Sequence, residues 1–419
     1  MLAAPIAVTL AAPIAVTLAA AIAAPALAAA PSEGALRAHL THELAISGSR
    51  SGAYVYDLTT KTALFSERAN IARPPASVEK LYTATTALEL MGPTGVLSTT
   101  VLGTGHLGPD GRWEGSLYLR GGGDPTFGSQ SFINEWYGGR GTSISKLAKH
   151  LVEIDGIHSV TGSVDGDESY LDALRGDPSS GYRQDPELIG NLSAVEFNRG
   201  ATGSERGPHA PAAYAARQLR AALRADGANV HGGSAATAPA GARVLATASS
   251  PTIATLLGIM LPPSDNYFAE TLIKDLGARF GGAGTTSAGA SVVRGTIAHL
   301  LHIHPRILDG SGLSHSDATT PRQVVSLLTM LAPTPLGATL RRDMAVAGES
   351  GTLERRMRRT PAAGRCQGKT GTLDGVSNVA GYCEADNGDQ LAFAFFTDGI
   401  EDTRAHTIQD NMTITLARY

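Results

Sequence analysis

The sequence predicts an α/β fold of the α+β kind, in which an antiparallel sheet and helices form one domain that is interrupted by a mixed α/β insertion. Two observations predict it. Segments with strand patterns stand near both ends of the 419-residue chain, and segments with helical spacing of apolar residues stand between them. The chain also exceeds one ordinary domain in length, and its 42% hydrophobic content is enough to form a core.

The N-terminal 31 residues carry no charged side chain and end in small residues such as Ala26-Leu27-Ala28. This pattern resembles a secretory signal with its cleavage site, although no Lys or Arg precedes the apolar part. The alternative is an uncleaved anchor, since the segment is long enough to span a bilayer. Its prolines and its many alanines favour cleavage. We therefore expect a signal peptide at residues 1–30, and an exported mature chain without a stable transmembrane span, in the periplasm or the extracytoplasmic cell wall.

The first third of the chain predicts two hairpins and a helix. Residues 52–67 alternate as two strands around a turn at Thr59-Thr60. A helix is expected from Ser77 to Met91, because prolines precede it and Gly92-Pro93 ends it. Residues 99–125 predict a second hairpin that turns at a Gly-Pro-Asp-Gly sequence.

The rest of the chain continues the alternation of helices and strands. Apolar spacing predicts helices over residues 143–157 and 212–227, and two more within 251–281 that Pro262-Pro263 separates. Strands are expected within 159–171, 364–385 and 391–398, followed by a helix over 402–416.

One of the six lysines of the chain, Lys80, stands three residues after Ser77 at the start of a predicted helix. On a helix this spacing places both side chains on one face. A serine needs a group that takes its proton before it can attack a carbonyl, and a lysine can do so if burial lowers its pKa. The positive end of the helix dipole would favour negative charge on Ser77. Ser77 is therefore a candidate nucleophile and Lys80 its candidate base.

A Ser-x-x-Lys pattern alone is weak evidence, and it recurs at Ser143 and Lys146, where it is typical of the solvated face of an amphipathic helix. Two further motifs strengthen the first one. Ser264-Asp265-Asn266 would by itself be a helix N-cap, and residues 369–372, Lys-Thr-Gly-Thr, would by themselves be a strand that enters a turn. Together and in this order, S-x-x-K, S-D-N and K-T-G are the motif set of class A β-lactamases and penicillin-binding proteins. The set favours an acyl-serine enzyme.

The chain resembles the class C low-molecular-mass penicillin-binding proteins, the D-alanyl-D-alanine carboxypeptidase/endopeptidase family, over nearly all of residues 45–419. The similar segments include "PPASVEKLYTATTALEL", "LRGGGDPTF", "SAVEFNRG", "DGSGLS" and "GKTGTLDGVSNVAGY". Residues 81–263 separate the first two motifs, far more than a compact β-lactamase core needs, and this interval matches the family's habit of inserting domains there.

This resemblance implies a penicilloyl-serine transferase (β-lactamase-like) catalytic domain built from residues 31–95 and 245–419. Residues 96–244 would form the inserted accessory domain. After "SAVEFN" the family usually continues with further strands, but here a short "RGATGSERGP" leads almost directly to the next predicted helix. We therefore expect an insertion that is reduced relative to the family.

The resemblance also implies a role for each motif residue. Ser77 would form the acyl-enzyme, Lys80 would take its proton, and Ser264 would relay a proton towards the leaving amine. Asn266 would hold the peptide amide of the substrate, and the terminal carboxylate would face a cation and hydroxyls, which suit an anion: Lys369, Thr370, Gly371 and Thr372. The backbone N–H groups of Ser77 and Thr372 would form the oxyanion hole. The sequence indicates no glutamate that would activate a deacylating water, so we expect slow release of penicillin.

The expected function is therefore that of a serine-type D-alanyl-D-alanine carboxypeptidase, with D,D-endopeptidase action left open. Its expected partners are peptidoglycan stem peptides that end in D-Ala-D-Ala and β-lactam inhibitors, and it would need no metal or organic cofactor. The alternatives are a β-lactamase-like hydrolase and a non-catalytic cell-wall-binding module of the same fold. The net charge of −4 gives no reason to expect a nucleic-acid partner.

The two cysteines, Cys366 and Cys383, lie equally far from a turn near Asp374-Gly375, so a hairpin would place them on neighbouring strands. An exported chain permits a disulfide, but cross-strand geometry does not always allow one. A disulfide and two buried thiols both stay open.

Three other patterns favour structural roles. The basic run from Glu354 to Arg359 predicts a solvated helix face, with contact to an anionic wall polymer as the alternative. A histidine group at positions 299, 302 and 304 lacks acidic partners at ligand spacing and predicts packing or surface residues rather than a metal site. The sequence from Asp309 to Gly312 predicts a glycine turn, which the resemblance places close to the cleft.

Overall fold

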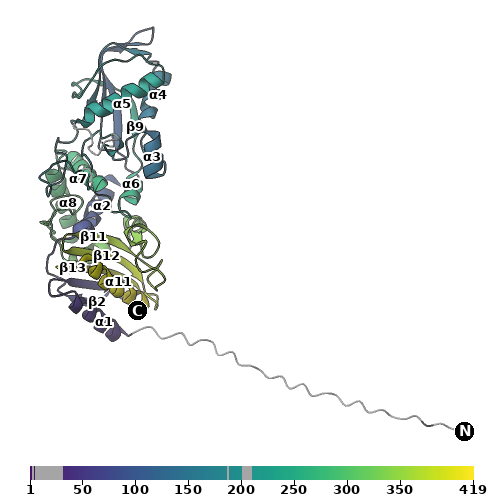
Figure 1. The fold of residues 1–419 in the computed structure, drawn as a ribbon, viewed down its shortest axis with the longest axis vertical. Coiled ribbons are helices and arrows are strands. Elements are labelled where there is room, and N and C mark those ends of the chain that lie inside the picture. Colours follow the sequence, from purple (N-terminus) through teal and green to yellow (C-terminus); the bar gives the residue numbers. More distant parts are fainter. Residues whose placement is uncertain (2–3, 5–31, 186–187, 201–209) are drawn as a thin grey trace.

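The computed structural model describes residues 1, 4, 32–185, 188–200 and 210–419. All of the predicted signal peptide except residues 1 and 4, and most of the short segment after "SAVEFN", lie outside the described residues. The folded part is long in one direction, with α1, β2 and α11 near one end and α4 and α5 near the other (Figure 1).

A six-stranded antiparallel sheet lies in the lower half of Figure 1, in the order β10-β11-β12-β13-β1-β2. Its members are β1 (Gly52–Asp57), β2 (Thr62–Glu67), β10 (Ala345–Val346), β11 (Cys366–Leu373), β12 (Val376–Glu384) and β13 (Gln390–Asp398). Strand β1 pairs with β13, so the two ends of the chain meet within one sheet. Strand β1 also pairs with β2, which confirms the predicted first hairpin. The pairing of β11 with β12 and of β12 with β13 confirms the predicted C-terminal strands.

Helices cover both faces of this sheet, which is why its central strands are apolar on both sides. On β13, Phe393 and Phe395 belong to the core under α1 (Glu33–Ile46) and α11 (Asp402–Arg418). The alternate residue Phe396 belongs to the larger core on the opposite face. That core contains residues of α2 (Lys80–Met91), α6 (Ile253–Met260), α7 (Asn266–Phe280), α8 (Thr286–Leu301), α9 (Pro321–Leu331) and α10 (Pro335–Arg342).

The inserted part has its own sheets and its own hydrophobic core. A four-stranded sheet has the order β8-β6-β3-β9 and consists of β3 (Ser98–Gly103), β6 (Leu117–Arg120), β8 (Val164–Asp167) and β9 (Arg243–Ser249). A smaller sheet contains β4 (His106–Leu107), β5 (Arg112–Glu114) and β7 (Ser159–Val160), and the helices are α3 (Gln130–Tyr137), α4 (Ile144–Lys149) with a π-turn (His150–Ile154), and α5 (Pro211–Ala225).

The mixture of antiparallel sheets and helices confirms the predicted fold class. The second hairpin is also confirmed, because β3 pairs with β6 and β4 pairs with β5. The domain division at residues 96 and 245 stays a prediction. Strand β9, which pairs with β3, runs across the second of these boundaries.

The basic run is not a helix, so that prediction is wrong. A short 3₁₀ turn (Gly351–Leu353) precedes it, and positive φ angles of 56° at Met357 and 59° at Arg359 are incompatible with a continuous helix. Arg356 turns inward and forms an ion pair of 2.7 Å with Asp410 of α11.

Among the residues that the structure describes, no group of three or more His, Cys, Asp or Glu side chains is placed to hold a metal ion.

Within the described residues, no single helix is long and apolar enough to cross a membrane. The helices α9 and α10 would suffice in length and composition only as a pair, and a bend of 118° separates them.

Candidate active site

Ser77 lies in a 3₁₀ turn (Ala76–Glu79) that leads directly into α2 at Lys80. In a 3₁₀ turn, side chains three residues apart lie above one another. The Lys80 Nζ atom accordingly lies 2.8 Å from Ser77 Oγ. Ala76, just before the serine, has a φ of 48°, a conformation that residues with a side chain rarely adopt. The predicted helix is therefore present, but its first turn is tighter than an α-helix.

Lys80 is fully buried and has three neighbours within hydrogen-bonding distance. Besides Ser77, its Nζ atom donates to Asn266 Oδ1 at 2.7 Å and to the backbone carbonyl of Ser311 at 2.8 Å. Burial lowers the pKa of Lys80 to about 8, although the charge of Glu79 acts in the opposite direction. A lysine with this pKa loses its proton readily, which is what a base towards Ser77 requires.

The S-D-N motif lies in the turn between α6 and α7. Asp265 caps α7 by accepting a hydrogen bond of 3.2 Å from the backbone of Phe268, so the N-cap interpretation holds for this residue. Ser264 has a φ of 66° and points instead to the site. Asn266, the first residue of α7, reaches Lys80. The two interpretations of this motif therefore apply to different residues within it.

The K-T-G motif lies on β11, where Lys369 is fully buried. Its Nζ atom donates to Ser264 Oγ at 2.7 Å and to the Thr370 carbonyl at 2.7 Å. Burial, and secondarily the charge of Lys80, lower the pKa of Lys369 well below its usual value. Thr370 donates to Thr352 at 2.7 Å, and Thr372 is exposed. The third motif thus contacts the second through a lysine–serine hydrogen bond.

Strand β11 and the Ser77 turn are packed tightly against each other at Gly371. A Cβ atom there would come within 2.8 Å of the Ser77 backbone nitrogen and 2.7 Å of the Pro75 carbonyl. Asn378, on the neighbouring strand β12, donates to the carbonyls of Pro74 and Pro75, each at 2.9 Å. The sheet therefore fixes the position of the nucleophile turn, and position 371 requires glycine.

The structure thus brings together the three motifs that the sequence predicted to act together. The other Ser-x-x-Lys pattern lies in the inserted part, at the start of α4, where Ser143 contacts Ser145 at 2.7 Å. Lys146 is exposed, so burial does not make it a stronger candidate base.

Sequence reasoning missed Arg199, which follows "SAVEFN" in the inserted part. Its guanidinium forms an ion pair with Asp265 of the second motif, with Nη2 3.2 Å from Oδ1, and lies 4.9 Å from the centre of the Tyr267 ring. The inserted part therefore contacts the S-D-N turn directly. The sequence contains no spacing signal for this pair, because 66 positions separate its members.

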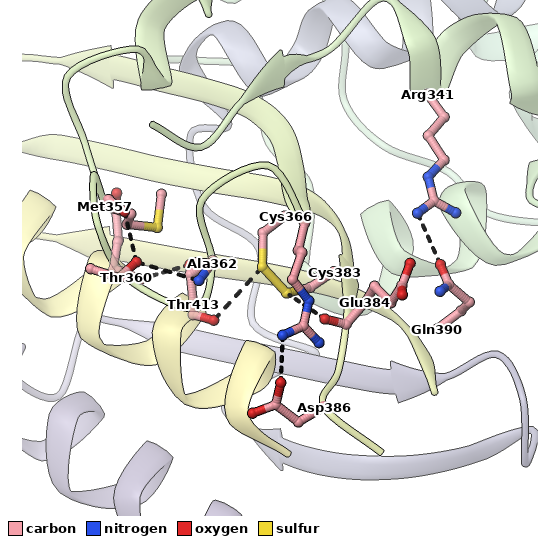
Figure 2. Close-up of a disulfide and its surroundings, with 12 residues drawn as sticks. Arg341, Met357, Thr360, Ala362, Cys366, Cys383, Glu384, Asp386, Gln390 and Thr413 are labelled. Atoms are coloured by element: carbon pink, nitrogen blue, oxygen red, sulfur yellow. Dashed lines mark hydrogen bonds and ion pairs between the residues drawn. A yellow bond between two sulfur atoms is a disulfide. The ribbon is translucent and has the colours of Figure 1, made fainter. Parts of the chain in front are cut away.

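A disulfide joins Cys366 of β11 to Cys383 of β12, two residues that face each other in the strand register. Figure 2 shows this bond beside Thr413 of α11. Of the two alternatives that the sequence left open, the structure contains the disulfide. It crosslinks β11 three residues before Lys369.

The chain matches the model of the D-Ala-D-Ala carboxypeptidase 3 (S13) family over residues 32–185 and 193–419. Among curated proteins, it is 30% identical to a D-alanyl-D-alanine carboxypeptidase of Actinomadura sp. strain R39, over 90% of this chain and 82% of that protein.

Among solved structures, penicillin-binding protein 4 of Haemophilus influenzae is similar, with a TM-score of 0.75 and 19% identity over 90% of this chain and 97% of that one. A predatory peptidoglycan endopeptidase of Bdellovibrio bacteriovorus is similar with a TM-score of 0.53 and 18% identity, over 82% and 85% of the two chains. These structures share the fold of this chain. Given the family match over most of its length, the chain belongs to the D-Ala-D-Ala carboxypeptidase 3 (S13) family of serine peptidases and is a D-Ala-D-Ala carboxypeptidase with the penicillin-binding-protein fold.

Proposed function

We propose that this enzyme removes the terminal D-Ala of peptidoglycan stem peptides through an acyl-enzyme on Ser77. One observation carries the proposal: Ser77 Oγ lies 2.8 Å from the amine of Lys80, whose pKa is lowered to about 8 by burial. The Ser77 hydroxyl proton would pass to the neutral amine while Oγ bonds to the carbonyl carbon of the penultimate D-Ala. The same chemistry opens a β-lactam ring and leaves penicillin bound to Ser77.

The second half of acylation needs a proton for the leaving amine. Ser264 is the proposed relay, because its Oγ lies 2.7 Å from Lys369 Nζ, within the contacts that join the second and third motifs. The C–N bond would break as Ser264 relays to the leaving nitrogen the proton that Lys80 took from Ser77, so free D-Ala would depart and Lys80 would be neutral again. Water would then cleave the ester on Ser77 and regenerate the hydroxyl.

Lys369, Thr370, Gly371 and Thr372 are the proposed site for the terminal carboxylate of the substrate, and Asn266 for its peptide amide. A carboxylate beside Lys369 would favour the charged amine and so offset the effect of burial on its pKa. The backbone N–H groups of Ser77 and Thr372 are the proposed oxyanion hole. The close packing of Gly371 on the Ser77 turn supports this assignment, because it brings the two backbone segments together.

Slow release of penicillin stays a prediction. Glu79 adjoins Lys80 in sequence, but it is fully buried and its carboxyl accepts hydrogen bonds of 3.1 and 3.3 Å from Thr83. Burial, with the nearby acids Asp309 and Asp317, also raises the pKa of Glu79 well above its ordinary value. A carboxyl group in this state is a poor activator of a deacylating water.

We also propose that the protein works outside the cytoplasm, in the periplasm or the cell wall, after removal of residues 1–30. The disulfide supports this location, since such bonds persist in oxidising compartments.

We further propose that residues 31–95 and 245–419 form the catalytic domain and that residues 96–244 form the accessory domain. The separate sheets and cores of the two parts support this division.

The test is release of D-alanine from a synthetic stem pentapeptide that ends in D-Ala-D-Ala, by wild type and by Ser77→Ala. The proposal predicts release by wild type and none above background by the variant. Equal release by both proteins would remove Ser77 from its role. A crosslinked peptide dimer in the same assay distinguishes the endopeptidase activity, and rapid turnover of penicillin would support the β-lactamase alternative.

A further inference from the structure

Glu270 is a fully buried carboxyl residue on α7, four residues after Asn266. Residues four apart share one face of a helix. Asn266 uses this face to contact the Lys80 amine at 2.7 Å. Glu270 uses it to accept two backbone hydrogen bonds through Oε1, from Gly310 at 3.0 Å and from Ser311 at 2.8 Å. The same face of α7 therefore contacts both the Lys80 amine, through Asn266, and the backbone of Gly310 and Ser311, through Glu270.

The loop from Asp309 to Ser314 offers the second acceptor to Lys80, the Ser311 carbonyl at 2.8 Å. The next N–H in the same planar peptide unit, that of Gly312, donates to Asp309 Oδ1 at 2.6 Å. Gly312 has a φ of 81°, and a Cβ there would lie 2.0 Å from the Ala76 carbonyl, so the loop packs directly on the Ser77 turn. Glu270 and Asp309 thus fix the direction of the Ser311 carbonyl.

This direction matters because of the shape of a neutral amine. A neutral Lys80 has two hydrogens and one lone pair, and the oxygens of a peptide carbonyl and of a side-chain amide only accept hydrogen bonds. With its hydrogens directed to Asn266 Oδ1 and to the Ser311 carbonyl, the amine has its lone pair left for Ser77 Oγ. An amine without one of these acceptors could rotate and direct a hydrogen at Ser77 instead.

We propose that Glu270 is a positioning residue for Lys80, which holds the Ser311 carbonyl so that the lone pair of the amine faces Ser77. The proposal rests on the proposed function, in which Lys80 is the base. Glu270 acts through its accepting oxygen rather than through a permanent charge, and its role is distinct from that of Asn266, which touches the amine itself.

The surroundings of Glu270 are consistent with a neutral carboxyl group. Burial, followed by the charge of Asp309, raises the pKa of Glu270 to about 8. The titratable groups that face it are Lys80 and Lys274 together with Glu79, Asp177, Asp309 and Asp317. Its second oxygen, Oε2, is buried without a hydrogen-bond partner among the described residues, which suits a carboxyl that keeps its proton there near neutral pH.

Two substitutions separate the accepting oxygen from the charge. Glu270→Gln keeps an accepting oxygen of the same reach, whereas Glu270→Met keeps the length and removes the acceptor. The matched control is Asp275→Asn, a fully buried carboxyl on the same helix whose electrostatic neighbours are Arg279 and Asp124 rather than Lys80. The readout is the rate of penicillin acylation by intact mass between pH 5.5 and 9.5, with circular dichroism as a check on folding.

At pH 7 we expect Glu270→Met to acylate about 10- to 100-fold more slowly than wild type. A loss of this size is typical when a catalytic group, here the Lys80 amine, is no longer held in its reactive orientation. Glu270→Gln should stay within about threefold of wild type, because the amide replaces the accepting oxygen. Its half-maximal rate should also lie at a slightly lower pH, because the fraction of Glu270 that is ionised near pH 8 raises the pKa of Lys80 in wild type. Asp275→Asn should keep the wild-type profile.

A folded Glu270→Met protein with the wild-type rate, or a Glu270→Gln protein as slow as the Met variant, would overturn the inference. If the Met variant does not fold, a folded Glu270→Gln protein that acylates more than about tenfold more slowly than wild type at pH 7 would overturn it. Failure of the proposed function is a separate result, since it would leave the wild-type protein itself without an adduct on Ser77.

Discussion

The acylation rate should depend on pH in a way that the burial of Lys80 determines. With a pKa of about 8, the amine is about 1% neutral at pH 6, about 10% neutral at pH 7 and about half neutral at pH 8. If only the neutral amine takes the Ser77 proton, the second-order rate of acylation by penicillin should rise about tenfold from pH 6 to pH 7, about fivefold from pH 7 to pH 8, and then level off. Between pH 6 and pH 8 the expected gain is about 50-fold.

Stopped-flow fluorescence or rapid-quench mass spectrometry at constant ionic strength measures this profile. Lys80→Arg should show no comparable rise, because a guanidinium stays protonated throughout this range. Lys146→Ala is the matched control, since this exposed lysine belongs to the other Ser-x-x-Lys pattern, and its profile should equal that of wild type. A wild-type rate that is flat from pH 6 to pH 9 would refute the reasoning that Lys80 is the base.

Three further predictions concern other parts of the molecule. Lys369→Ala should weaken release of D-alanine from substrates with a free terminal carboxylate, and unchanged release would contradict the carboxylate site. Glu79→Gln should unfold at a higher urea concentration than wild type at pH 7, and the difference should be smaller at pH 5. The reason is that folding raises the pKa of Glu79. The contribution of the Glu79 carboxyl to stability is therefore full below its unfolded pKa near 4.3 and falls as pH rises. An equal difference at both pH values would oppose this assignment. Replacing Cys366 and Cys383 by alanine should cost about 3 kcal/mol of unfolding free energy for a closed loop of 17 positions, and a double variant as stable as wild type would contradict it.

Local signals in the sequence predicted the elements that hold the site. The prolines before Ser77 and the Gly92-Pro93 pair gave nearly the right bounds for the helix over 77–91, and Pro262-Pro263 separates α6 from α7 as expected. The 3₁₀ start of the first helix was not predictable in this way. It depends on a positive φ at Ala76, and Asn378, 303 positions from Pro75, holds the turn in place.

The residues that the sequence did not reveal are those whose roles come from burial and from distant partners. Glu270 lies in "NYFAETLIKDLG", where a charged residue is typical of the solvated face of a helix. Only the packing of the 309–314 loop over α7 makes it a buried acceptor. The prediction that the basic run forms a helix was wrong for a related reason. The composition of the run favours a helix, but left-handed backbone conformations at Met357 and Arg359 override this preference.

The central claim is that Ser77, activated by Lys80, forms the acyl-enzyme. Intact-mass analysis and peptide mapping after penicillin treatment test it most directly in three proteins: wild type, Ser77→Ala and the control Ser143→Ala. We predict one penicilloyl group on the peptide that contains Ser77 in wild type and in Ser143→Ala, and no adduct in Ser77→Ala. A covalent adduct of the same mass on Ser77→Ala would contradict the claim.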